Sequence, residues 1–428
     1  MTAFSSATIP PDSKPAQRPP LMPLDEALQR LLAHAVALGR HEAVSCFQAD
    51  GRVLAQDVVS ALQVPPHDNS SMDGYAVRAA DVAAAGAELP VSQRIAAGQS
   101  GTPLAARSAA RIFTGAPMPA GADAVVMQED TQALDGGARV RINAVPTAGQ
   151  WVRAAGEDVT RGAAVLSKGE RLAPASIGLA AGIGLAELTV AARPRVALFS
   201  TGDELVMPGA VPPAQMKPGA IYNSNRFFLR ALLMRLGCDV SDLGIVADNR
   251  AATLSALQSA ASGHDLILTS GGVSVGEEDH IKPAVEQLGQ LDLWQIAMKP
   301  GKPFAYGHVD RAAGGQTHFM GLPGNPVSSF VTFLLLVRPF LLKLQGATRL
   351  DVPALRLRAD FDLPRPDKRR EFLRARRNAE GGLDLFANQS SGVLTSVRWS
   401  DGLIDHPAGS TIARGDAVRF IPLAELLT

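Results

Sequence analysis

The chain has 428 residues, a length that predicts two to four domains at roughly 100 to 200 residues each. Hydrophobic residues make up 46% of it and charged residues 19%, a composition that excludes a largely disordered chain. Its 41 Lys and Arg residues balance its 41 Asp and Glu residues, and this zero net charge argues against a nucleic-acid-binding protein.

The sequence lacks the marks of a secreted or membrane-bound protein. Residues 1–22 predict a flexible, Pro-rich tail, because they have no apolar core like that of a signal peptide. The most apolar run, residues 330–344, is interrupted by Arg338 and Pro339 and so predicts a buried helix rather than a membrane span. The only two cysteines are too far apart for a metal knuckle, and a disulfide framework is not expected. We therefore expect a cytoplasmic protein that binds no membrane.

The first predicted elements are a helix and a set of short strands. Leucines recur with helical spacing from Leu24 to Leu32, which predicts an amphipathic helix. From Val53 to about Ala192, short strand-like runs alternate with turn dipeptides, and one helix is expected near residues 174–181. We expect residues 23–192 to form one N-terminal region of helix and strands.

From Arg195 onward, continuous apolar strands alternate with helical segments. This pattern predicts a wound α/β domain with a parallel sheet over residues 195–346, because strands that are apolar throughout fit burial on both faces. Strand-like runs then return over residues 350–428, with turns expected at Gly381-Gly382 and Asp401-Gly402. That stretch predicts a small β domain.

The candidate functional residues of the α/β domain follow its strands, because ligands of such sheets bind beyond the carboxyl ends of the strands. Glycine-rich residues 270–276 could bring backbone N–H groups close to a phosphate or another oxyanion. Carboxylates, which are suitable ligands for Mg²⁺ bound to phosphates, follow three of the strands. They are Glu204, Asp248, Glu277, Glu278 and Asp279.

Other polar segments admit two interpretations each. Lys299 and Lys302 lie in a Pro- and Gly-containing turn, where they could attract an anion or remain solvated surface charges. Residues 68–76, 113–123 and 153–158 could be turns or parts of a site. The GxxxxGK[ST] phosphate-binding motif is absent.

Eight segments, taken together and in order, resemble the molybdopterin molybdenumtransferase family, which includes MoeA and the gephyrin E domain. They read NSSMDGYA, FTGAPMPAGADAVVMQED, GEDV, STGDEL, IYNSN, TSGGVSVGEEDHIK, KPGKPFAYG and GLPGNPVSS. The resemblance runs from about Leu24 to the C-terminus. The segment SGGVSVG alone would also fit molybdopterin adenylyltransferases and CinA-like proteins.

The resemblance implies a multidomain fold of α/β and β parts. It places a MogA-like, molybdopterin-binding wound sheet at the centre, a helical and β N-terminal part with an inserted β domain at about 60–150, and a C-terminal β barrel. It also implies a homodimer whose active site is shared between the subunits. Molybdopterin adenylyltransferase and apo-molybdoenzymes are possible further partners.

The implied reaction is the insertion of molybdate into adenylylated molybdopterin, with Mg²⁺-dependent release of AMP. The implied catalytic residues are Asp73, Thr114, Asp158, Glu204, Asp248 and Asp279. Of these, Glu204, Asp248 and Asp279 are the expected metal ligands. The expected binding residues are Ser270, Gly271, Gly272, Ser274, Gly276, Lys299, Lys302, Pro323, Asn325 and Pro326. A molybdopterin adenylyltransferase and a gephyrin-like dimeric scaffold are the alternatives.

Overall fold

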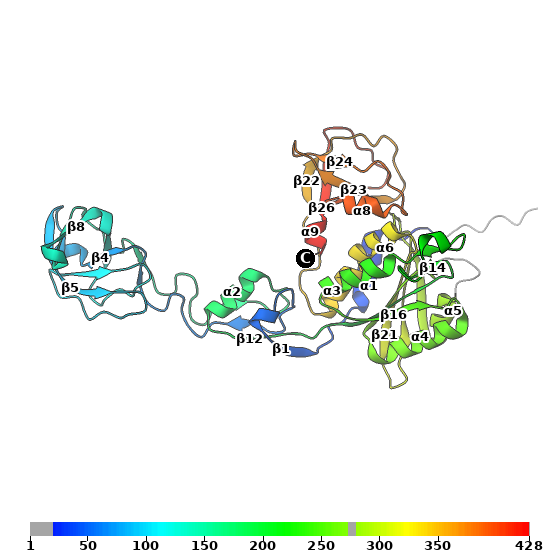
Figure 1. Ribbon diagram of the computed structural model, residues 1–428, viewed down its shortest axis with the longest axis horizontal. Coiled ribbons are helices and arrows are strands. Elements are labelled where there is room, and N and C mark those ends of the chain that lie inside the picture. The colour runs from blue at the N-terminus through cyan, green and yellow to red at the C-terminus, as the bar shows by residue number, and fades with distance from the viewer. Residues whose placement is uncertain (1–19, 273–279, 428) are drawn as a thin grey trace, which may run out of the picture. The chain divides into compact units, whose positions relative to one another are not determined.

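The computed structural model describes residues 20–272 and 280–427 and forms two compact units (Figure 1). The larger unit contains the described residues up to Gly39 together with those from Ala192 onward, and the smaller unit is Arg40–Ala191. This division differs from the expected N-terminal region over residues 23–192. Helix α1 (Leu24–His34) belongs to the larger unit, where the Lys343 ammonium donates to the Leu32 carbonyl at 2.8 Å.

A six-stranded sheet forms the centre of the larger unit. Its strand order is β16 (Asp239–Val246), β13 (Arg195–Thr201), β17 (Leu266–Ser270), β21 (Gln316–Leu322), β20 (Pro303–Asp310) and β18 (Gly289–Gln295). The first four strands are parallel, whereas β20 and β18 are antiparallel to their neighbours. The expectation of a wholly parallel sheet is therefore wrong. Residues 311–315 join β20 directly to β21 as a hairpin, and a short turn can connect only antiparallel strands.

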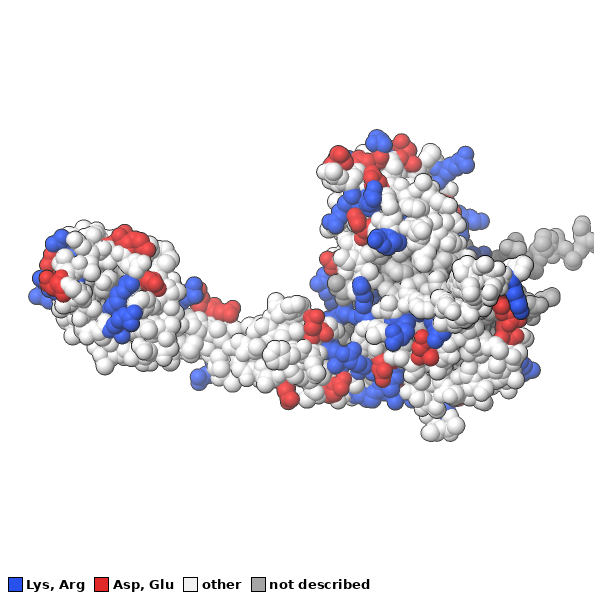
Figure 2. All heavy atoms as spheres, viewed as in Figure 1, with Lys and Arg blue, Asp and Glu red and all other residues white. Residues whose placement is uncertain are grey.

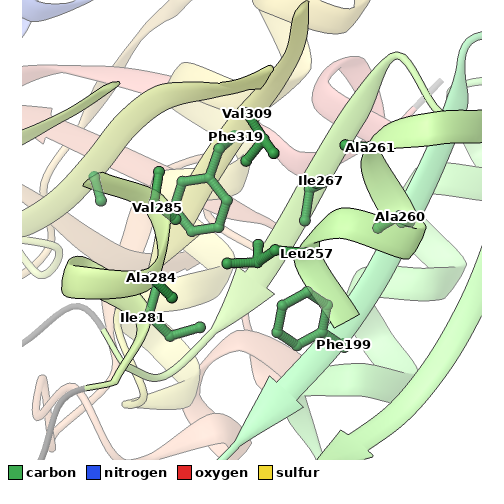
Figure 3. Close-up of a cluster of buried hydrophobic side chains, with 12 residues drawn as sticks. Phe199, Leu257, Ala260, Ala261, Ile267, Ile281, Ala284, Val285, Val309 and Phe319 are labelled. Atoms are coloured by element: carbon green, nitrogen blue, oxygen red, sulfur yellow. The ribbon is translucent and has the colours of Figure 1, made fainter. Parts of the chain in front are cut away.

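Helices cover both faces of this sheet. α4 (Arg250–Gly263) and α5 (Ile281–Leu288) pack on one face, and α3 (Asn225–Arg235) with α6 (Pro326–Thr332) on the other. Phe199 lies in the core beneath α4 and α5 (Figure 3). Because successive side chains of a strand point to opposite faces, the neighbouring buried residues of β13 fill the core under α3. The continuous apolar strands thus have the two-sided burial that their sequence predicts.

The apolar run near residue 335 forms a buried helix, as expected. α6 continues through a π-helical segment, Phe333–Val337, into α7 (Arg338–Leu344). The π segment ends at Val337, two residues before Pro339, whose missing N–H disrupts ordinary α-helical bonding. Within the described part of the chain, this is the one helix long and apolar enough to cross a membrane, and 89% of its most apolar window is buried in the protein.

A second sheet forms the C-terminal part of the larger unit. It contains β19 (Met298–Lys299), β22 (Leu355–Arg358), β23 (Arg370–Arg377), β24 (Leu383–Leu385), β25 (Gly402–His406) and β26 (Ala417–Pro422), with α8 (Leu394–Trp399) and α9 (Leu423–Leu427) beside it. A bridge between Ala359 and Leu383 links the end of β22 to β24. Of the expected turn at Asp401-Gly402, Asp401 lies in a bend and Gly402 is the first residue of β25, where the Phe420 ring packs in the space that a side chain would occupy.

The smaller unit is built from strands, short 3₁₀ helices and one α-helix, α2 (Pro174–Gly182), which lies close to the position that the sequence predicts. One part has the paired strands β1 (His41–Ser45) with β12 (Glu187–Ala191), β2 (Val58–Val59) with β11 (Ala164–Leu166), and β3 (Asn69–Ser70) with β10 (Val152–Arg153). The other part is a six-stranded sheet inside the range 60–150. Its order is β7 (Ala124–Met127), β4 (Gly74–Val77), β6 (Ala109–Ile112), β5 (Ala87–Ile95), β9 (Arg139–Ile142) and β8 (Thr131–Leu134).

Charged side chains of both signs are interspersed on the visible face of each unit (Figure 2). This distribution agrees with the zero net charge of the sequence. Charged groups that serve function must therefore be identified as individual side chains.

Candidate functional site

A cavity of about 550 Å³ lies at the carboxyl ends of β13 and β17 in the larger unit. Its wall consists of residues from four segments, 200–205, 221–225, 270–271 and 324–326, together with Gly392. The first two segments include the short parallel strands β14 (Leu205–Val206) and β15 (Ile221–Tyr222). Five of the expected site residues line this cavity, namely Glu204, Ser270, Gly271, Asn325 and Pro326.

The glycines after β17 allow a close approach between neighbouring strand ends. Gly271 has φ +92°, and a side chain there would lie 2.9 Å from the Thr201 carbonyl oxygen. Gly272 has φ +66°, and its side chain would meet Ile281 of α5. However, the Gly271 N–H donates to the Leu322 carbonyl at 3.0 Å, so it is not available to a phosphate as the sequence suggested. Ser274, Gly276 and Asp279 lie outside the described residues.

Asn225, the first residue of α3, fastens two walls of the cavity together. Its Nδ2 donates to Ser270 Oγ at 2.8 Å and to the Gly324 carbonyl at 2.7 Å. Asn225 is only 8% exposed, so water competes little for these bonds. The amide therefore fixes the end of β17 against the loop that precedes α6, where Pro323 is buried beside Gly324.

Two other wall residues have hydrogen-bonding atoms without partners. Ser200 Oγ and Asn223 Nδ2 are both buried and make no hydrogen bond. Burying a polar group in this way costs about 1–3 kcal/mol. Such groups are rare in folded proteins and call for an explanation.

Two of the three expected metal ligands follow adjacent parallel strands. Thr201 of β13 is in register with Val246 of β16, so Glu204 and Asp248 follow the same edge of the sheet. Glu204 is exposed, and its carboxylate lies over Gly202. Among residues 20–272 and 280–427, no three His, Cys, Asp or Glu side chains group closely enough to hold a metal ion. Asp248 is not part of the cavity wall.

The charge of Lys299 is balanced by two carboxylates of the C-terminal sheet. Its ammonium lies 2.8 Å from Glu371 Oε1 and 3.1 Å from Asp367 Oδ2. The hydrogen bond with Glu371 is the main cause that raises the pKa of Lys299. Lys299 thus links β19 to β23 within the C-terminal sheet, and because two carboxylates already balance its charge it is less suited to attract an anion than the sequence suggested. Lys302 is half-buried and has no ion pair with any described carboxylate.

The smaller unit brings together two expected catalytic residues. The backbone N–H and the hydroxyl of Thr114 both donate to Asp73 Oδ1, each at 2.8 Å. These bonds, with a smaller contribution from Arg111, hold the pKa of Asp73 below its usual value. Asp158 is exposed, and its N–H donates to the Val64 carbonyl at 2.9 Å. The described contacts do not connect Asp158 with Asp73.

Three protein-family profiles match the chain in succession. They are described as "MoeA N-terminal region (domain I and II)" over residues 22–184, "Probable molybdopterin binding domain" over 197–343 and "MoeA C-terminal region (domain IV)" over 356–423. The Molybdopterin molybdenumtransferase of Haemophilus influenzae is 41% identical over 76% of this chain and 78% of its own length. The Molybdopterin molybdenumtransferase 2 of Mycobacterium tuberculosis is 38% identical over 89% of this chain and 94% of its own length.

The chain belongs to the molybdopterin molybdenumtransferase family.

A solved structure agrees with this membership. The molybdopterin biosynthesis MoeA protein of Pyrococcus horikoshii OT3 superposes with a TM-score of 0.80 at 28% identity, covering 94% of this chain and 100% of that one. The resemblance of the eight sequence segments to the molybdenumtransferase family is therefore confirmed. The match to the profile described as "Probable molybdopterin binding domain" covers the central sheet, at whose edge the cavity lies.

Within this molybdenumtransferase fold, the cavity contains polar residues that the sequence did not single out. Ser200, Asn223 and Asn225 join the expected residues there. The two asparagines belong to the segment IYNSN, and their presence between a short strand and a helix was the available signal. Their roles depend on hydrogen bonds and burial, which the sequence does not display.

Proposed function

We propose that this chain inserts molybdate into adenylylated molybdopterin and releases AMP, completing the molybdenum cofactor. The observation that carries the proposal is a polar cavity at the strand ends of a molybdopterin-binding domain. Its wall offers the hydroxyls of Thr201 and Ser270 and the amide of Asn325, which suit the phosphates of a nucleotide.

The reaction breaks the phosphoanhydride that joins AMP to molybdopterin and transfers molybdenum to the dithiolene sulfurs. In this proposal the cavity holds the adenylyl group, and Asn225 keeps Ser270 and the loop at Gly324 in place around it. Preorganised donors are effective because they need no rearrangement when charge develops on the departing phosphate.

The oxygen ligands at the strand ends suit Mg²⁺, which commonly binds one or two carboxylates together with substrate phosphates. Glu204 and Asp248 are the described residues that would hold it, and Asp279 is proposed as a third ligand. When bound, Mg²⁺ would offset the negative charge of the phosphoanhydride.

We propose a homodimer in which Asp73, Thr114 and Asp158 of one subunit complete the site of the other. Two observations support the proposal. The Asp73–Thr114 pair is held rigidly by hydrogen bonds although the described cavity does not include it. Phe47 is 102% exposed, so a partner that covered its ring would remove apolar surface from water.

The proposed cellular setting follows from the reaction. The substrate would come from a molybdopterin adenylyltransferase, and the product would pass to apo-molybdoenzymes in the cytoplasm. A stand-alone adenylyltransferase and a gephyrin-like scaffold are not favoured, because the curated relatives that match most of the chain are named molybdenumtransferases.

The proposal is tested by incubating the purified protein with adenylylated molybdopterin, Mg²⁺ and molybdate. We expect AMP release that depends on molybdate, and a product that reactivates an apo-molybdoenzyme. Sulfate in place of molybdate serves as the control. If AMP release is the same with sulfate or without any oxyanion, molybdate insertion is not the reaction.

A further inference from the structure

Two arginines lie side by side on the six-stranded sheet of the smaller unit. Arg94 of β5 and Arg111 of β6 are partners in the parallel register of these strands, so their side chains leave the same face of the sheet. Neither guanidinium forms an ion pair with a described carboxylate. Because two like charges this close repel each other, the pair is unfavourable unless an anion lies near it.

The other two arginines on the strands of this sheet have their charges balanced. Arg139 and Arg141 of β9 each lie 2.8 Å from a carboxylate oxygen of Glu88, which belongs to β5. On the opposite edge of β5, no described carboxylate takes the corresponding place beside the first two arginines. Their unbalanced charge is therefore a local feature and not a general property of this sheet.

An aromatic ring and neutral acceptors hold the two guanidiniums. Their Cζ atoms lie 4.5 Å (Arg94) and 4.7 Å (Arg111) from the centroid of the Phe113 ring, which is the range of a cation–π interaction. Arg111 also donates to the Gly74 carbonyl at 3.0 Å and to Gln128 Oε1 at 2.8 Å. These contacts orient the guanidiniums but do not neutralise them. Since both lie against one ring, a single small ligand can reach the two of them.

The arginine pair adjoins Asp73 and Thr114, which are proposed above as catalytic residues. Gly74, whose carbonyl accepts from Arg111, follows Asp73 directly, and Phe113 directly precedes Thr114. The Asp73 carboxylate accepts both hydrogen bonds of Thr114 at one oxygen and makes no ion pair with Arg111. Neither arginine is buried, so a ligand can approach from solvent.

We propose that Arg94 and Arg111 bind a tetrahedral, doubly charged oxyanion on the smaller unit. The planar fork of a guanidinium matches such an oxyanion with two parallel N–H bonds, and two guanidiniums balance its two charges. A phosphate monoester and molybdate share this chemistry. The site shares no residue with the cavity at the central sheet, and its existence does not depend on the proposed function.

The test observes the two arginines directly in full-length protein labelled with ¹⁵N at arginine. NMR follows their Nε–Hε signals, which are assigned by the loss of one signal in Arg94→Gln and of the other in Arg111→Gln. Molybdate and methyl phosphate are added in separate titrations at constant ionic strength, with chloride as the reference anion. Anion binding elsewhere in the protein does not confuse the measurement, because each signal belongs to one side chain.

We expect both signals to shift together along one saturating curve. Arg94→Gln should weaken the anion response of the Arg111 signal at least about tenfold, because the ligand loses its contact with one of two cations. Arg94 makes no hydrogen bond in the described part of the chain, so this variant should fold normally. Arg139→Gln is the matched control and should leave both curves unchanged, because Glu88 already balances the charge of Arg139.

The two titrations also identify the ligand. A saturating response to molybdate alone supports a molybdate site, a response to methyl phosphate alone supports a site for a phosphate group, and a response to both supports a site for tetrahedral oxyanions in general. The proposal is overturned if neither anion gives a saturating shift beyond that of chloride, or if Arg139→Gln weakens the response as much as Arg94→Gln does. Molybdate-dependent AMP release is measured separately, so either result leaves the proposed function to its own test.

Discussion

Thr114 binds Asp73 twice at a single carboxylate oxygen, once through its backbone N–H and once through its hydroxyl. Asp73 precedes β4 and Thr114 follows β6, and these two strands are antiparallel neighbours. The pairing of the strands therefore brings together two residues that are 41 positions apart in the sequence. A carboxylate held in this way is oriented and remains ionised.

The first prediction concerns the pKa of Asp73. Thr114→Val removes the hydroxyl bond but keeps the backbone bond, so the pKa of Asp73 should rise toward the ordinary value of 3.8. Carbon-detected NMR titration of the Asp73 carboxyl measures the change. Thr114→Ser, which retains a hydroxyl, should leave the pKa where it is. An unchanged pKa in the Val variant would show that the hydroxyl bond is unimportant.

The second prediction concerns magnesium. Glu204→Gln and Asp248→Asn each remove a proposed ligand charge, so each should raise the Mg²⁺ concentration for half-maximal AMP release at least about tenfold. Glu286→Gln, which neutralises an exposed carboxylate on α5, is the control and should have no effect. Equal Mg²⁺ dependence in all four proteins would exclude these carboxylates as ligands.

The third prediction tests the shared site. At a Mg²⁺ concentration that only just suffices for the wild type, Asp73→Asn and Glu204→Gln should each leave the homodimer with little activity, since each alters every site. When the two variants are unfolded and refolded together, half of the dimers are mixed and each mixed dimer has one intact site. Activity should then return to about a quarter of wild type. If the mixture stays inactive although mixed dimers form, both residues act within one subunit.

The fourth prediction separates the two lysines of the turn. Lys299→Gln leaves the nearly buried carboxylate of Glu371 without its closest cation, which should destabilise the larger unit by about 1–3 kcal/mol. Lys302→Gln breaks no ion pair with a described residue and should leave the melting temperature unchanged. Differential scanning calorimetry compares the two. A larger loss of stability in Lys302→Gln would contradict the assignment.

The sequence pattern was sufficient for the elements whose signal is local. The strand at Arg195–Thr201 was predictable because burial on both faces makes it apolar throughout. The helix at Leu24–His34 was predictable because burial on one side leaves apolar residues at helical spacing. The strand at Gly289–Gln295 was missed, since it pairs with residues beyond the Pro- and Gly-containing turn that separates it from β20. The start of β25 was hidden because Gly402 is required by the packing of Phe420.

The candidate site shows the same division. Glu204 and Gly271 could be found because topology places residues that follow parallel strands at one edge of the sheet. The ion pair of Lys299 could not be predicted, because its partner Asp367 lies 68 positions away and only folding brings the two side chains together. Likewise, an Asn between a strand and a helix predicts a turn, and only burial shows that Asn223 has an unsatisfied amide.

The last prediction concerns a buried histidine next to the central sheet. His318 Nδ1 lies 3.1 Å from the Tyr306 hydroxyl, and the Phe340 ring packs edge-on against the imidazole. Burial lowers the pKa of His318 to about 4, with further lowering by His34, His308 and Arg311. Burial also raises the pKa of Tyr306, so its hydroxyl stays protonated and donates to a neutral imidazole.

Because the folded pKa of His318 is depressed, the unfolded chain binds the proton more tightly. The folded state therefore keeps its full stability at a pH above 6.5, the pKa of His318 in the unfolded chain. It loses stability as the pH falls toward about 4, the pKa in the folded chain. Between pH 7 and pH 5 the larger unit should lose about 2 kcal/mol. The ring centroids of Trp294 and Tyr306 are 5.9 Å apart. With the other two tryptophans replaced (Trp151→Phe, Trp399→Phe), the fluorescence of Trp294 reports unfolding of this region. His318→Gln should remove most of the pH dependence of the urea midpoint, and a dependence equal to that of the parent would assign it to other groups.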